Sequence, residues 1–373
     1  MHRPGLKVYS ISALTNWWPD PVDGNTAPVL RYPWKTPPEP GQTLEVAPGV
    51  LWIRMPLPMK LDHVNLYALD DGDGWTVIDT GFGSRTTRRL WAEVLSGPMA
   101  GRPVNRVIMT HHHPDHMGNV GWFQAEHGAE LLSTRTSWLF ARMLYLDDQD
   151  RPPAETLDFW RSAGMTQDIL NKRAAEKPFN YADIAYHMPL GFTRLQQDDV
   201  IEMGGRTWDV HVGNGHAPEH ATFWSRDDNL VISGDQILPS ISPNIGVYVT
   251  EPEADPLAGW LEACERFLPM SRDDHLVLGG HKLPFTGLPV RMRQLIDNHH
   301  GALERLLKHL KDPHAAAECF AALFKRNIGE AEYGLALVEA VAHVNHLYKQ
   351  GLVTRARRAD GAWAYRVRGR DHG

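Results

Sequence analysis

Four side chains that commonly bind metal ions lie within one short run of the chain. They are His111, His113, Asp115 and His116, in the run Thr-His-His-His-Pro-Asp-His at 110–116. The residues before it, 104–109, are mostly apolar and predict a short buried strand, so the run lies where a strand ends and a loop begins. Histidine nitrogen and carboxylate oxygen suit a Zn-like ion, and two pairs of ligands in one loop can serve two ions. The run therefore predicts a metal centre.

Three later segments repeat one pattern, an apolar strand followed by glycine and then by histidine or aspartate. The residues in the ligand position are His216, Asp235 and His281, and each follows a glycine directly. Glycine lets the backbone turn sharply and approach an ion closely. Because strand ends converge on one edge of a sheet, we expect these side chains to meet those of the histidine run.

The composition is that of a soluble globular protein and excludes some classes of function. The chain has 373 residues, of which 42% are apolar and 22% charged, and its net charge is −7, so it is no general polyanion binder. Its two cysteines, Cys264 and Cys319, form no CxxC pair, which favours a reducing compartment. The first residues lack an export signal and no stretch is apolar for long enough to span a bilayer. We expect a cytoplasmic protein without membrane contact.

The order of elements predicts three parts. Residues 1–43 are rich in Pro, Gly, Trp and Asn and predict an extended N-terminal arm. Residues 44–285 predict a catalytic domain in which strands and helices alternate, and 286–373 predict a separate C-terminal domain. Regular elements are expected as strands at 46–56, 63–69, 75–78, 104–109, 193–195, 200–203, 207–212, 221–224, 230–232 and 275–278, and as helices at 85–95, 118–127, 256–267 and 290–310.

A helical insertion interrupts the catalytic domain at about 135–190. It carries eleven aromatic or methionine side chains, among them Phe140 and Trp160, and Pro152-Pro153 divides it. The aromatic side chains can pack a small core of their own. They can also form a lid over the metal site that supplies an apolar substrate pocket, and both interpretations can hold together.

The last 60 residues predict a different module. Helices fit 315–324 and 335–349, and two short strands fit 352–355 and 362–367 with a turn at Asp360-Gly361. In the second helix Leu337, Val341, Val344 and Tyr348 fall on one stripe. A helix, a helix and a hairpin in this order indicate a winged helix.

The ordered motifs resemble those of the metallo-β-lactamase fold superfamily, specifically its hydrolase branch. Asp79-Thr80-Gly81 is similar to the first motif and residues 111–116 to the second, and the third to fifth motifs correspond to His216, Asp235 and His281. The resemblance covers about 44–285. It implies an α+β fold, an αββα sandwich of two mixed sheets with helices outside. The C-terminal segment resembles, more weakly, the winged-helix tail of the β-lactamase-like protein 2 group.

The resemblance also implies a role for each residue of the site. One divalent metal ion would take His111, His113 and His216, the other would take Asp115, His116 and His281, and Asp235 would bridge them. Asp79 would brace the histidine run through hydrogen bonds. The ions would be Zn²⁺, with Mn²⁺ or Fe²⁺ as alternatives, and a histidine at position 113 favours hydrolysis over diiron redox chemistry. His220 is a further candidate, as a group that orients a ligand or substrate or as a structural histidine.

These roles predict a metal-dependent hydrolase that uses a metal-bridging hydroxide, with Asp115 as the catalytic group that orients the hydroxide and passes on a proton. The aromatic insertion favours a small acyl substrate such as a thioester, a lactone or another ester. The alternative is a metal-dependent nuclease that binds RNA or DNA through a basic tail. The tail's cations are Lys349, Arg355, Arg357, Arg358, Arg366, Arg368 and Arg370. Winged helices also serve as dimer modules, so a homodimer is a further expectation.

Overall fold

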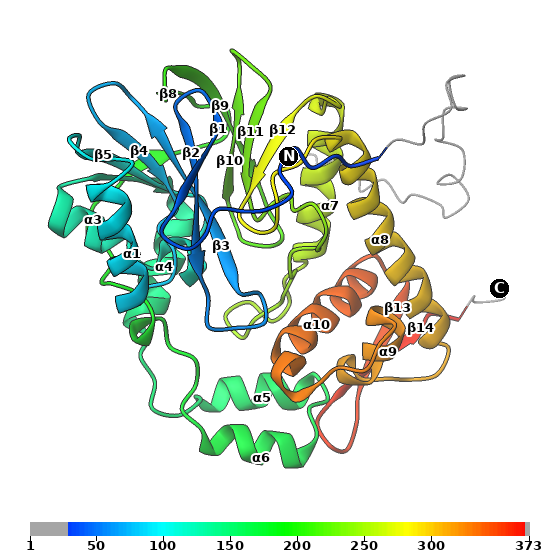
Figure 1. The fold of residues 1–373 in the computed structure, drawn as a ribbon. Coiled ribbons are helices and arrows are strands. Elements are labelled where there is room, and N and C mark those ends of the chain that lie inside the picture. Colours follow the sequence, from blue (N-terminus) through cyan, green and yellow to red (C-terminus); the bar gives the residue numbers. More distant parts are fainter. Residues whose placement is uncertain (1–28, 370–373) are drawn as a thin grey trace, which may run out of the picture.

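Two β-sheets packed face to face form the centre of the computed structural model, which describes residues 29–369 (Figure 1). The larger sheet has its strands in sequence order, antiparallel from the first to the fourth and parallel from the fourth to the seventh. They are β1 Thr43–Ala47, β2 Val50–Pro56, β3 His63–Asp70, β4 Trp75–Ile78, β5 Val104–Met109, β6 Glu130–Thr134 and β7 Thr193–Leu195.

The smaller sheet has the order β12-β11-β10-β9-β8, and only the pair β11 and β12 is parallel. Its strands are β8 Val200–Met203, β9 Arg206–Gly213, β10 His220–Ser225, β11 Leu230–Gly234 and β12 Leu276–Gly279. The mixed α/β sandwich expected from the sequence is therefore confirmed. Strand β6, which the sequence analysis did not predict, extends the larger sheet beyond β5.

Alternating side chains of each strand divide the interior into layers. In β5, Ile108 faces the core between the two sheets, whereas Val107 and Met109 face the core between the larger sheet and its helices. Successive side chains of a strand point to opposite faces, and the segment of β5 that is buried on both faces, 107–109, is apolar. This burial holds the end of β5, and with it the histidine run, at a fixed place on the edge of the sheet.

Helices cover both outer faces of the sandwich (Figure 1). Helix α1 begins after Ser84, whose hydroxyl accepts a hydrogen bond from the Thr87 N–H, and α7 begins after Asp255, which accepts one from the Ala258 N–H. The α-helices are α1 Arg85–Ser96, α2 Pro114–Met117, α3 Val120–His127, α4 Arg135–Leu146, α5 Ala154–Ser162, α6 Gln167–Ala175, α7 Pro256–Phe267, α8 Leu288–His309, α9 Phe320–Phe324 and α10 Tyr333–Lys349. Single 3₁₀ turns occur at η2 Tyr181–Asp183, η3 Leu268–Met270, η4 Ala316–Cys319 and η5 Glu330–Glu332.

The helical insertion has no core of its own, which corrects one of its two interpretations. Helix α4 packs on the larger sheet through Trp138 and Tyr145. Helices α5 and α6 instead join the core of the C-terminal part, to which Phe159 and Trp160 belong, and the Ala317 N–H donates to the Ala163 carbonyl. The insertion therefore ties the sandwich to the C-terminal part.

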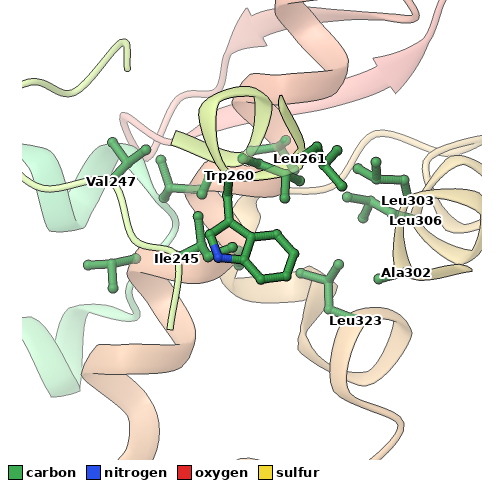
Figure 2. Packing of buried hydrophobic residues seen from close by; sticks show 14 of the residues in the cluster. Ile245, Val247, Trp260, Leu261, Ala302, Leu303, Leu306 and Leu323 are labelled. Atoms are coloured by element: carbon green, nitrogen blue, oxygen red, sulfur yellow. The ribbon is translucent and has the colours of Figure 1, made fainter. Parts of the chain in front are cut away.

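The C-terminal part shares the largest core of the protein with the smaller sheet and α7. Figure 2 shows the Trp260 indole of α7 between Ile245 on one side and Ala302 of α8 and Leu323 of α9 on the other. Helix α10 is buried on most of its surface. The hairpin of β13 Val353–Arg357 and β14 Trp363–Val367 follows it, so the predicted order of helix, helix and hairpin is confirmed. Because this core is continuous, removal of the residues that follow α8 would expose α7 and α8.

The predicted N-terminal arm is described only in part, because residues 1–28 lie outside the described residues. The irregular stretch that follows is fixed where Arg31 and Thr286 exchange two backbone hydrogen bonds. None of the helices in the range 29–369 combines the length and the apolar content needed to cross a membrane.

Candidate metal centre

Three imidazole nitrogens converge at the end of β5. The Nε2 atom of His111 and the Nε2 atom of His216 each lie 3.0 Å from Nδ1 of His113. The Nδ1 atom of His216 donates to the Asn244 carbonyl at 2.8 Å, so its Nε2 presents a lone pair. The Nδ1 atom of His111 lies 3.0 Å from the hydroxyl of Thr110, which leaves its Nε2 to present a lone pair as well. A tetrahedral zinc ion would separate such nitrogens by roughly 3.3 Å, close to the spacing found.

A second group lies beside the first and contains two histidines and two carboxylates. The Nε2 atom of His281 lies 3.4 Å from Asp115 Oδ2 and 3.2 Å from Asp235 Oδ2. The Nε2 atom of His116 lies 3.4 Å from Asp235 Oδ1 and 3.8 Å from Asp115 Oδ2. The other ring nitrogens are already occupied, since Nδ1 of His281 donates to the His63 carbonyl at 2.7 Å. Both Nε2 atoms therefore face the carboxylates.

Asp235 lies between the two groups. Its Oδ2 atom is 3.5 Å from His216 Nε2 on one side and 3.2 Å from His281 Nε2 on the other. Its Oδ1 atom and the Nε2 atom of His116 are buried without a hydrogen-bond partner among the described residues. Buried polar atoms are normally paired, so these two atoms fit a group that accepts electron pairs. A cation meets this requirement.

The electrostatics differ between the two groups. Burial and the neighbouring histidines hold the pKa of His111 and of His113 well below its usual value, so both rings are neutral and can offer lone pairs. Burial opposes protonation of His281 too, but Asp235 and Asp115 outweigh it and raise its pKa to about 10. Burial by itself would raise the pKa of Asp235, but the neighbouring histidines outweigh burial and lower this pKa. The second group is thus a compact set of opposite charges, in which a metal ion can replace the protons.

Asp79 holds the histidine run in place. Its carboxylate accepts hydrogen bonds of 2.8 Å from the Thr110 N–H, the Thr110 hydroxyl and Nδ1 of His116. The last of these bonds fixes the tautomer of His116 and leaves its Nε2 free to face the site. The Asn119 side chain secures the turn after Asp79 by donating to the carbonyls of Thr80, Gly81 and Phe82.

Two glycines allow the backbone to approach the site. A Cβ atom at Gly280 would lie 2.2 Å from Asp235 Oδ1 and 2.7 Å from Cε1 of His116. Gly234 has a φ of +49°, and a Cβ there would lie 2.6 Å from Cε1 of His220. A side chain at position 280 would occupy space that Asp235 and His116 need, and one at position 234 would collide with the ring of His220. The glycine that precedes a ligand thus has a steric role here, besides its freedom to turn.

His220 lies behind the site and is fully buried. Its Nε2 atom accepts a hydrogen bond from the Asp235 N–H at 3.1 Å, and its ring stacks on that of His111 with centroids 4.6 Å apart. This placement suits a residue that orients Asp235 and His111, and it leaves no direct path to a substrate. His112 belongs to none of the groups of described residues that could hold a metal ion, and its ring packs between those of His113 and Phe140 of α4.

All seven predicted ligands come together at one edge of the sandwich. Three sets of them have ligand atoms within 4.8 Å of one another: His111, His113 and His216; His111, His116 and Asp235; and Asp115, His116 and His281. The sequence analysis missed one residue that positions the first group. Asn244 binds His216 through its backbone, and nothing in its sequence context marks it. Asn65 supports the loop of His281 by donating to the carbonyls of Gly279 and Lys282.

Comparisons with known proteins agree with this site. The model of the metallo-beta-lactamase superfamily matches residues 59–288, and that of the metallo-beta-lactamase-like, C-terminal domain matches residues 303–368. A probable metallo-hydrolase, YqjP, of Bacillus subtilis (strain 168) is 24% identical over 312 residues, which cover 82% of this chain and 94% of that protein.

Two solved structures are similar over most of the chain. A beta-lactamase domain protein from Burkholderia ambifaria is 36% identical with a TM-score of 0.84, over 91% of this chain and 98% of that one. A metallo-beta-lactamase family protein from Thermus thermophilus is 25% identical with a TM-score of 0.72, over 87% of this chain and 100% of that one. With the clusters of histidine and aspartate, these matches make the protein a metal-dependent hydrolase. The chain belongs to the metallo-beta-lactamase superfamily.

Proposed function

We propose that the protein is a dinuclear hydrolase that cleaves a small acyl compound, namely a thioester, a lactone or another ester. The observation that carries the two-metal part is the position of Asp235, whose Oδ2 atom lies within 3.5 Å of a nitrogen from each group. One carboxylate between two sets of ligands is the arrangement that a pair of bridged cations requires. The ions we propose are Zn²⁺, because the set combines five imidazoles with two carboxylates; Mn²⁺ and Fe²⁺ are the alternatives.

Two divalent cations held there would lower the pKa of a shared water towards neutrality and polarise the scissile carbonyl. Asp115 is the group we propose for orienting the attacking hydroxide and for passing a proton to the leaving group. Its side chain is 17% exposed, against 8% for Asp235 and 2% for His281. Asp115 is therefore the carboxylate of the site that solvent and substrate reach most easily.

The surroundings of the site support an organic substrate. The second half of the insertion runs beside the turns that hold the site, since the Tyr186 N–H donates to the Gly118 carbonyl at 2.7 Å and the Gly83 N–H donates to that of Ile184. Tyr181 is buried in the same stretch, and Phe140 of α4 packs on His112. Trp160 belongs to the C-terminal core instead, so it does not contribute to an apolar wall at the metal centre.

The nuclease alternative loses part of its support from the contacts of the tail. Arg355 pairs with Glu253 and lies over the rings of Tyr348 and Trp363. Arg358 pairs with both Glu318 and Asp360. Side chains held in this way are poorly placed to bind phosphates. We therefore keep nucleic acid as the second candidate only.

The remaining expectations stay proposals. The boundaries at 43/44 and 285/286, a winged-helix character of the C-terminal module and a homodimer all await a direct test. A cytoplasmic location is supported by Cys264 and Cys319, which are free, buried thiols.

A substrate screen with a metal control tests the proposed function. Zinc-loaded and chelator-stripped protein would be assayed with acyl thioesters, lactones, aryl esters, a phosphodiester and RNA, alongside Asp115→Asn. We expect turnover of an acyl compound that disappears on stripping, returns with Zn²⁺ and falls at least about 100-fold in Asp115→Asn. Asp274→Asn is the matched control, because Asp274 is an exposed aspartate that pairs with Arg272 and contacts none of the proposed ligands. Turnover of phosphodiester or RNA, with every acyl compound inert, would overturn the substrate class.

A further inference from the structure

A second cavity lies in the C-terminal part, and none of the seven metal-site residues lines it. Its volume is about 410 Å³, and helices α8 and α10, the end of α9 and the 242–244 segment line it. That volume is in the range of pockets that bind small organic molecules. Apolar side chains form part of its wall, among them Ala302 and Leu323, which Figure 2 shows on the side away from Ile245. The rest of the wall is polar and charged.

Cations line one part of the cavity. Arg305 of α8 donates through Nε and Nη2 to the carbonyls of Ala322 and Leu323, both at 2.9 Å, which holds the guanidinium rigidly. Its Nη1 atom has no hydrogen-bond partner within 29–369, and neither Arg305 nor Lys325 makes an ion pair there. Arg326, which also lines the cavity, forms an ion pair with Glu332. A guanidinium held in place with one free nitrogen, next to an unpaired lysine, is suited to bind a carboxylate.

In another part of the cavity, a backbone carbonyl fixes the direction of the hydrogen bond between His299 and His343. His343 donates through Nδ1 to the Glu339 carbonyl at 2.8 Å, so its Nε2 must accept from Nδ1 of His299 at 3.2 Å. Burial lowers the pKa of His299 to about 3 and that of His343 to about 4, so both rings are neutral. The Nε2 atom of His299 is therefore a bare acceptor, and it is buried without a partner among the described residues.

Two more acceptors line the same part. The amide of Asn244 donates to Glu339 Oε2 at 2.8 Å and to the Leu335 carbonyl at 3.2 Å. Its Oδ1 atom is buried and has no partner within residues 29–369. No cation pairs with Glu339 in the described part of the chain, and burial raises its pKa to about 7. Two buried acceptors without a donor among the described residues, beside a carboxylate without a cation, call for a donor group from outside the chain.

The cationic and the acceptor parts are separated along α8. Arg305 follows His299 by six positions, or about 9 Å along the helix axis. We propose that this cavity binds a small ω-amino or hydroxy carboxylic acid, with its carboxylate at Arg305 and Lys325 and its amine or hydroxyl at His299, Asn244 and Glu339. The charges then match at both ends. The proposal does not depend on the substrate of the metal centre.

Calorimetric titration of the zinc-loaded full chain tests this site without any readout of activity. The probes are 4-aminobutanoate, 5-aminopentanoate and 6-aminohexanoate, with hexanoate and hexylamine as probes that lack one end. We expect at least one amino acid to bind with a stoichiometry of one, and both single-ended probes to bind at least about tenfold more weakly. Absence of saturable binding for all three amino acids, or equal binding of hexylamine, would overturn the proposal.

Variants locate the site. Arg305→Gln is expected to weaken binding of the amino acid about tenfold or more, and Lys325→Gln, at an exposed position, gives a second variant if the first fails to fold. Arg293→Gln is the matched control, because Arg293 is exposed on the same helix and does not line the cavity. Unchanged affinity in both cavity variants, or an equal loss in the control, would place the ligand elsewhere.

Discussion

A single methyl group at Gly280 should disable the metal centre. In Gly280→Ala the new Cβ would lie 2.2 Å from Asp235 Oδ1 and 2.7 Å from Cε1 of His116. The loop has little freedom to retreat, because the Gly280 N–H donates to the Gly234 carbonyl at 2.9 Å and its carbonyl accepts from the Asn65 N–H at 2.7 Å. Relief of the contact needs a shift of about 1 Å in Asp235, whereas metal–ligand distances vary by only about 0.2 Å. We therefore expect zinc affinity to fall by about 100-fold or more.

Gly279→Ala provides a control at the neighbouring position. Its Cβ would meet Ile237 O and Leu238 Cδ2 at 3.3 Å, which requires shifts of only a few tenths of an ångström. Competition with a chromophoric chelator gives zinc affinity, elemental analysis gives metal content, and thermal unfolding shows that each variant folds. If Gly280→Ala folds and retains zinc with the affinity of Gly279→Ala, the deduction that Asp235 and His116 hold metal is refuted.

Three further perturbations address other parts of the structure. Asp235→Ala should lose at least one equivalent of zinc, because it removes the carboxylate between the two groups; unchanged content by elemental analysis would exclude a bridging role. Deletion of residues from 313 onward should abolish cooperative unfolding, because it strips the core from α7 and α8, and a soluble truncation with a sharp melting transition would show that this core is dispensable. The pKa of Glu339 rises from 4.5 to about 7 on burial. The folded state therefore holds a proton that the unfolded state releases between pH 4.5 and pH 7, and folding loses roughly 3 kcal/mol of stability as pH rises through this range. Glu339→Gln should lack this loss. Its free energy of unfolding, measured with denaturant and compared with that of the unaltered protein, should therefore be larger at pH 8 than at pH 5. The same difference in free energy at both pH values would contradict the pKa shift.

The two sheets, their covering helices and the strand ends that carry the metal ligands could be predicted from the sequence, because capping residues and apolar periodicity mark these elements locally. Helix α7 has the predicted bounds, 256–267, because Asp255 and Pro256 mark its start and an apolar face runs its length. Strand β6 was missed because it has only five residues and follows α3 after a two-residue turn. The turn of helix at Pro114–Met117 was read as a loop, since four residues are too few to establish a period.

Long-range packing decided the rest. In α10 the stripe of Leu337, Val341 and Val344 is buried as expected, but Tyr348 is 37% exposed and residues on the other faces are buried too. Periodicity identifies the first buried face of a helix. It cannot show which other segments cover the remaining faces, and these come here from α7, α9 and the 244–247 segment. The same limit hid Asn244. Its side chain bonds to α10 and its backbone to His216, and no local pattern records either contact.

Anomalous X-ray scattering from crystals of the zinc-loaded protein measures the central feature most directly. With X-rays at the zinc absorption edge, we expect two anomalous peaks, both at the end of the sandwich where the seven predicted ligands meet. One should lie about 2.0–2.1 Å from His111 Nε2, His113 Nδ1 and His216 Nε2, and the other at a similar distance from the Nε2 atoms of His116 and His281, with Asp235 contacting both. A crystal of fully loaded protein with no peak among these side chains, or with its zinc bound elsewhere, would contradict the metal centre.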